Sequence, residues 1–108
     1  APSLENIKSL LREGATIRAF DPEAMENIKN KIGDVIEYAD NSYDALKGAD
    51  ALLIFTEWQI FRNPEFTEIK KLLNDPVIFD GRNLYDLEDM RSIGFYYHSI
   101  GRAIIERG

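Results

Sequence analysis

Apolar residues recur at intervals of three and four along two stretches of the chain, which is the spacing of one face of an α-helix. They are Leu4, Ile7, Leu10 and Leu11 in the first stretch, and Phe66, Ile69, Leu72 and Leu73 in the second. Ser3 is a suitable N-cap for the first helix, and Gly14 is a suitable stop. The pattern predicts amphipathic helices between Ser3 and Gly14 and over residues 65–74. A more polar helix is expected over residues 23–31, and short helices over residues 42–47, 58–61 and 87–93.

Short segments with the composition of β-strands lie between these helices. They are residues 15–20, 35–38, 51–55 and 77–79, and a last strand that begins at residues 95–97 and ends near Gly101. The segment 51–55 is apolar on both faces, which is typical of a central strand in a parallel sheet that is covered on both sides. A buried helix can have the same pattern, but the short length and the flanking polar residues favour a strand.

The alternation of helices and strands predicts an α/β fold with a mostly parallel sheet and no internal domain boundary. In such sheets ligands bind beyond the carboxyl ends of the strands. The loops in that position are Asp21-Pro22, Thr56-Glu57-Trp58 and Asp80-Gly81-Arg82-Asn83. The first element is a helix, whereas this kind of fold normally starts with a strand. We therefore expect the sheet to lack its first strand, which leaves unpaired edges beside the gap.

The charge of the chain limits its partners. The formal net charge is −6, so the long-range field repels nucleic acids and anionic membrane surfaces, and neither is expected to bind. A small phosphorylated ligand stays compatible with this charge because converging arginines act at short range. The chain has no cysteine, which excludes disulfides and cysteine nucleophiles and suits a cytoplasmic protein. Residue 1 is alanine rather than methionine, so the chain either was processed or is a piece of a longer protein, and we expect the second.

The loop Asp80-Gly81-Arg82-Asn83 carries the clearest candidate chemistry. Gly81 permits a sharp turn and a close approach to a ligand. The guanidinium of Arg82 presents a planar fork that matches a phosphate group. The alternative is a surface ion pair between Arg82 and Asp80 or Asp86, and the position in the chain does not decide between the two.

Other polar residues have structural explanations. Thr56-Glu57-Trp58 is suited either to contact with a sugar or base or to capping a short helix with the indole in the core. His98 has no second histidine or cysteine with which to share a metal, so we interpret it as a surface or partly packed residue. Asp86, Glu88 and Asp89 fall in the first turn of a predicted helix, where the helix dipole favours carboxylates. No catalytic, metal-binding or dinucleotide-binding residue is expected, because the motifs for such sites do not occur.

Five ordered motifs extend over nearly the whole chain. They are Ala1-Pro2-Ser3-Leu4 with Leu10-Leu11 and Gly14-Ala15; Phe20-Asp21-Pro22; Gly48-Ala49-Asp50-Ala51 with Thr56-Glu57-Trp58; Phe79-Asp80-Gly81-Arg82-Asn83; and Met90-Arg91 with Gly94-Phe95, Tyr97 and Ile100-Gly101-Arg102. Together they resemble the C-terminal domain of the UDP-glucose/GDP-mannose dehydrogenase family. The Thr56-Glu57-Trp58 element is more similar to the UDP-glucose branch than to the other branches.

This resemblance implies a Rossmann-like, three-layer domain of a longer enzyme that oxidises UDP-glucose to UDP-glucuronate. In this family an N-terminal domain binds NAD, a central helical region makes the dimer, and the C-terminal domain closes over the nucleotide sugar. The nucleophilic cysteine belongs to the preceding part, as does a first strand whose loop brings a lysine to the nucleotide sugar. The resemblance therefore implies that residues 1–108 are inactive alone, and that the remaining domains of a homo-oligomeric parent are partners. Among the residues present it implies a substrate-binding role for Arg82.

Two other interpretations share the alternating pattern of helices and strands. One is a free-standing α/β ligand-binding or oligomerisation module without catalysis. The other is a receiver-like signalling domain, which needs an acidic pair after an early strand and a lysine after a late strand. The second is disfavoured because the late loop carries Arg82 in place of a lysine.

Overall fold

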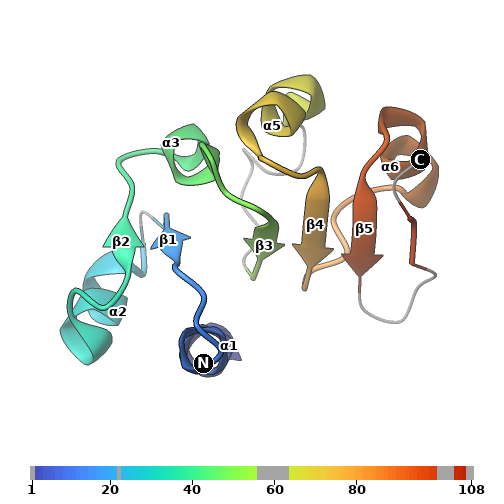
Figure 1. The fold of residues 1–108 in the computed structure, drawn as a ribbon. Helices are drawn as coiled ribbons and strands as arrows, with labels where there is room; N and C mark the ends of the chain where they lie inside the picture. Colours follow the sequence, from blue (N-terminus) through green and yellow to red (C-terminus); the bar gives the residue numbers. More distant parts are fainter. Residues whose placement is uncertain (1, 22, 56–63, 100–103, 107–108) are drawn as a thin grey trace. The chain divides into compact units, whose positions relative to one another are not determined.

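The computed structural model describes residues 2–21, 23–55, 64–99 and 104–106. They form two compact units, Ala1–Ala45 and Leu46–Gly108, shown as ribbons in Figure 1. In both units helices alternate with parallel strands. This alternation confirms the predicted α/β class.

The first unit is built around one pair of parallel strands. Its elements are α1 (Pro2–Arg12), β1 (Arg18–Ala19), α2 (Met25–Ile32), β2 (Glu37–Tyr38) and most of α3 (Ser42–Leu46). In the pairing of β1 with β2, Arg18 lies opposite Glu37. Both strands are shorter than the segments 15–20 and 35–38 that the composition predicts.

The two ends of α1 follow local backbone rules. Gly14 has a φ of 92°, in the left-handed region, and the amide of Ala15 donates to the carbonyl of Leu10 at 3.0 Å. This end is the stop that the sequence predicts. The helix starts at Pro2, so Ser3 lies within it and not before it. Proline suits the first turn of a helix because the N–H that it lacks has no intrahelical partner there.

The second unit is a three-stranded parallel sheet with two described helices. Its elements are β3 (Leu52–Ile54), α5 (Phe66–Leu72), β4 (Val77–Asp80), α6 (Leu87–Ile93) and β5 (Tyr96–Ser99). The strand order is β3-β4-β5, and the three arrows point the same way in Figure 1. These elements confirm the strands predicted at 51–55 and 77–79, the last strand predicted to begin at 95–97, and the helices predicted at 65–74 and 87–93. The helix predicted at 58–61 lies outside the described residues.

Both sheets have strands with an unpaired edge among the described residues. Within the described part of the chain, β1 pairs with β2 alone and β3 pairs with β4 alone. Unpaired edges of this kind are expected where the first strand of the fold is absent. The outer edge of β5 carries an antiparallel bridge between Tyr97 and Ile105.

Alternate residues of β4 and β5 face the core of the second unit. The buried positions are Ile78 and Asp80 in β4 and Tyr97 and Ser99 in β5, each exposed by 2% or less. Ile69, Met90 and Phe95 also belong to this core, at 1% exposure or less. The opposite face of the sheet carries Phe79, which is 40% exposed. The two faces therefore differ in burial although both carry large apolar side chains.

This difference between the faces predicts the effect of truncating neighbouring residues. Ile78→Ala should lower the free energy of unfolding by about 2–5 kcal/mol, because it leaves a cavity in the core. Phe79→Ala removes a larger side chain that is already partly exposed, so its effect should be smaller. Chemical denaturation of both variants measures the difference. An equal or greater loss for Phe79→Ala would contradict the assigned faces.

Candidate functional site

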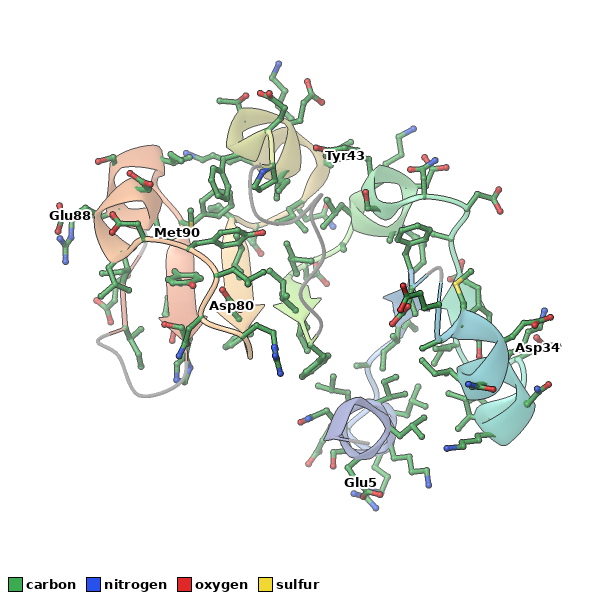
Figure 2. The ribbon with its side chains drawn as sticks, turned by 180° about the vertical axis from the view of Figure 1, so that it is seen from behind. Glu5, Asp34, Tyr43, Asp80, Glu88 and Met90 are labelled. Carbon is green, nitrogen blue, oxygen red and sulfur yellow. The ribbon has the colours of Figure 1, made fainter. Side chains whose placement is uncertain are left out.

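A short loop connects the carboxyl end of β4 to α6, and its first anchor is the carboxylate of Asp80. Oδ1 of Asp80 accepts the amide N–H of Arg82 at 2.8 Å, and Oδ2 accepts that of Leu84 at 2.7 Å. A carboxylate that accepts two amides from the residues following it fixes the backbone of a turn. Figure 2 labels Asp80 at the end of β4, close to the chain that leads to α6. The position of Arg82 is thus set by the residue two places before it.

The second anchor is the hydroxyl of Tyr97 in β5. It donates to Oδ2 of Asp80 at 2.6 Å, and the amide of Tyr85 donates to it at 3.3 Å. The Tyr97 side chain is fully buried. One hydroxyl therefore links β5 to the start of the loop through Asp80 and to its end through Tyr85.

The third anchor joins the loop to β3. The amide of Gly81 donates to the carbonyl of Ile54 at 2.8 Å. A Cβ at Gly81 would lie 3.0 Å from that carbonyl oxygen, closer than side-chain carbons normally approach. Gly81 permits the tight turn, as predicted, and the structure adds the reason, which is the approach of the β3 backbone. Asn83 follows with a φ of 55°, a left-handed conformation that asparagine tolerates.

The side chain of Arg82 is exposed on this anchored loop. Neither carboxylate of the alternative interpretation pairs with it among the described residues. Asp80 is committed to loop amides and Tyr97, and Asp86 accepts the amide of Asp89 at 3.1 Å as the N-cap of α6. The surface ion pair is therefore not formed, and the ligand-binding role of Arg82 stays a prediction.

The loop after β1 has a structural role. Oδ1 of Asp21 accepts the amides of Glu23 and Ala24, both at 2.9 Å, immediately before α2. Pro22 and the Thr56-Glu57-Trp58 loop lie outside the described residues. The structure therefore describes one of the three predicted strand-end loops in full, the one that carries Arg82.

The other described polar residues singled out in the sequence lie on the surface or make local contacts at α6. His98 is exposed, and its ring lies 6.0 Å from that of Phe79. Asp86 caps α6, and Glu88 forms an ion pair with Arg91. No group of three potential metal ligands comes together among the described residues. The side chain of Tyr38 reaches the end of α2, where its hydroxyl donates a hydrogen bond to the carbonyl of Gly33. Burial raises the pKa of Tyr38, and the nearby charge of Asp34 raises it further.

Sequence reasoning missed the role of Tyr97, which it placed in a strand without further function, and took Asp80 as a possible ion-pair partner of Arg82. A signal was present for both. Asp80 lies two residues after Ile78, so the alternation of the strand puts it on the buried face. A buried carboxylate needs donors, and a buried tyrosine in the neighbouring strand supplies one.

A parallel sheet whose middle strand ends in a fixed, arginine-bearing loop is an arrangement typical of ligand-binding α/β domains. The model of the UDP-glucose/GDP-mannose dehydrogenase family, UDP binding domain, matches residues 1–87. The chain belongs to this family. Its membership excludes the receiver-like interpretation.

Curated relatives are similar along almost the whole chain. UDP-glucose 6-dehydrogenase TuaD of Bacillus subtilis is 42% identical over 97% of this chain and 23% of its own length. UDP-glucose 6-dehydrogenase of Pseudomonas aeruginosa is 41% identical over 94% of this chain and 24% of its own length. The chain therefore spans about a quarter of the length of the relatives that it matches.

Solved structures of two archaeal dehydrogenases share the fold. NDP-N-acetyl-D-galactosaminuronic acid dehydrogenase from Methanosarcina mazei superimposes with a TM-score of 0.58 at 20% identity, covering 90% of this chain and 28% of that one. UDP-D-ManNAc dehydrogenase from Pyrococcus horikoshii gives a TM-score of 0.56 at 20% identity, with 89% and 29% coverage. Across the described ranges, no helix of this chain has the length and apolar character needed to cross a membrane.

The capping role of Asp86 makes a prediction about stability. Asp86→Ala should lower the free energy of unfolding by about 0.5–2 kcal/mol, because the Asp89 amide loses its acceptor, and Asp86→Ser should retain most of the stability. The matched control is Glu88→Ala, which removes an exposed ion pair on the same helix and should have an effect below about 0.5 kcal/mol. Thermal unfolding of the three variants tests this, and equal losses for Asp86→Ala and Glu88→Ala would contradict it.

Proposed function

We propose that residues 1–108 are the C-terminal nucleotide-sugar-binding domain of an NAD-dependent UDP-glucose 6-dehydrogenase, which oxidises UDP-glucose to UDP-glucuronate. The match to the UDP binding domain and the identity to enzymes of that name support this proposal. We further propose that the parent enzyme is cytoplasmic and homo-oligomeric. The rest of the parent enzyme supplies the catalytic residues.

The observation that best supports the proposal is the exposed position of the Arg82 side chain on a fixed loop. Its backbone is fixed at the carboxyl end of β4, and its guanidinium is exposed and forms no ion pair with a described residue. A guanidinium in this position can donate two parallel, charge-assisted hydrogen bonds to anionic oxygens. A nucleotide sugar carries such oxygens on its diphosphate. The role proposed for this chain is to bind and orient the nucleotide sugar.

In the proposed reaction NAD, when bound, accepts the hydride from the substrate. The described residues contain no glycine-rich loop that opens a helix, which is the arrangement that holds the pyrophosphate of a dinucleotide. They therefore do not fit an NAD site. We assign NAD binding mainly to another part of the enzyme and no catalytic step to this chain.

The Arg82 contact is testable in the full-length enzyme. Arg82→Ala should reduce kcat/KM for UDP-glucose by about 2–4 kcal/mol, because a charge-assisted contact to the nucleotide sugar is lost, whereas the KM for NAD should change much less. Arg82→Lys should recover only part of the loss, since lysine keeps the charge without the planar fork. Steady-state kinetics and melting temperature are measured together. Near-normal kcat/KM in a folded Arg82→Ala enzyme would remove Arg82 from the site.

The division of labour between this chain and its parent gives another prediction. Purified residues 1–108 should not reduce NAD in the presence of UDP-glucose, because the chain contains neither a cysteine nucleophile nor a dinucleotide fingerprint. The assay follows NADH absorbance, with the full-length enzyme in the same buffer as the positive control. Turnover by the purified fragment above the no-enzyme rate would show that the assignment is wrong.

A further inference from the structure

Asp80 is a buried carboxylate that the proposed function does not use directly. It is 2% exposed, and the described residues give it no cationic partner. A carboxylate in such a place is stable only when hydrogen bonds replace the water that it has lost. Those bonds come from two loop amides and from the Tyr97 hydroxyl. The negative charge of Asp80 therefore interacts with groups of the loop and of β5, and not with solvent.

The two amides that Asp80 holds lie on either side of the Arg82 side chain. One is the amide of Arg82 itself, and the other is that of Leu84. The Cα from which the guanidinium extends is therefore fixed before a ligand arrives. A group that is already oriented loses less conformational entropy on binding, so the affinity gained from its contact is larger.

Tyr97 orients the carboxylate in turn. Its hydroxyl donates to the same Oδ2 that accepts the Leu84 amide, and it also lies within hydrogen-bonding distance of the amide and the carbonyl of Tyr85. The hydroxyl therefore holds both Asp80, at the start of the loop, and Tyr85, at its end. Because Tyr97 belongs to β5, the loop is coupled to the pairing of β4 with β5.

We infer that Asp80 and Tyr97 are positioning residues for Arg82. They raise the affinity for the diphosphate of the nucleotide sugar, although neither of the two side chains touches it. This inference rests on the proposed role of Arg82. Both side chains are buried, at 2% and 0% exposure, so their effect on a ligand passes through the loop. The diphosphate is a suitable ligand because its anionic oxygens can accept hydrogen bonds from the exposed guanidinium.

The test measures the Kd of UDP by calorimetry with the full-length enzyme. Asp80→Asn keeps the volume but replaces one acceptor oxygen by an amide group, and Tyr97→Phe removes only the hydroxyl. Each should raise the Kd by about 10-fold, because a displaced contact group loses its alignment with the ligand. The matched control is Tyr96→Phe, which removes a hydroxyl from the opposite face of β5 and should change the Kd less than about 2-fold. Melting temperatures identify any variant that does not fold, and if Asp80→Asn is such a variant, Tyr97→Phe carries the test.

A double-mutant cycle separates positioning from a general effect on the fold. If Asp80 and Tyr97 act through Arg82, then adding either substitution to Arg82→Ala should change the Kd by less than about 2-fold further. The same 10-fold weakening in both backgrounds would overturn the inference, as would an unchanged Kd in folded Asp80→Asn and Tyr97→Phe enzymes. Normal UDP binding by Arg82→Ala alone would overturn the proposed role of Arg82 and the inference with it. This last result is distinguishable because it appears without any change at Asp80 or Tyr97.

Discussion

The arrangement of the candidate site depends on the burial of one carboxylate. Asp80 faces the core of the second unit, where a charge is unfavourable unless donors surround it. The donors available are the amides of the following loop and the hydroxyl of Tyr97. The hydrogen bonds that stabilise the buried carboxylate are therefore the same ones that determine the shape of the loop. A leucine at this position would be equally well buried, but the loop would lose the acceptor that determines its turn.

The parallel sheet supplies the remaining constraints. β4 lies between β3 and β5, so the loop that follows it is held from both sides. On one side the Gly81 amide reaches the carbonyl of Ile54, and on the other the Tyr97 hydroxyl reaches Asp80. A loop after an edge strand would have only one such neighbour. The middle strand is thus a position from which this sheet can present an exposed side chain on a backbone held by both neighbouring strands.

Local sequence signals were sufficient for most elements of the fold but not for the network beneath the loop. The predicted range 87–93 is that of α6, and Gly94, the predicted stop, adopts a left-handed φ of 97°, whereas Asp86, expected in the first turn, is instead the N-cap just before the helix. Strand lengths were overestimated at 15–20, because composition does not show how many residues find a partner. The bond between Asp80 and Tyr97 joins residues 17 positions apart, and it depends on the register of β4 with β5. Alternation places each residue on the buried face, whereas the contact between them arises from tertiary structure.

The hydrogen bonds around Asp80 are also compatible with the proposed binding of an anionic ligand by an acidic chain. The net charge of −6 acts over distances at which salt screens it, whereas a guanidinium acts within hydrogen-bonding distance. Local binding then depends less on the total charge than on whether the arginine is already paired. Asp80 is the nearest carboxylate in the sequence and the obvious competitor for Arg82. Its burial beneath the loop removes that competitor, because its oxygens accept backbone amides and a hydroxyl. The negative charge that holds the loop in place therefore leaves the positive charge on the loop available to a ligand.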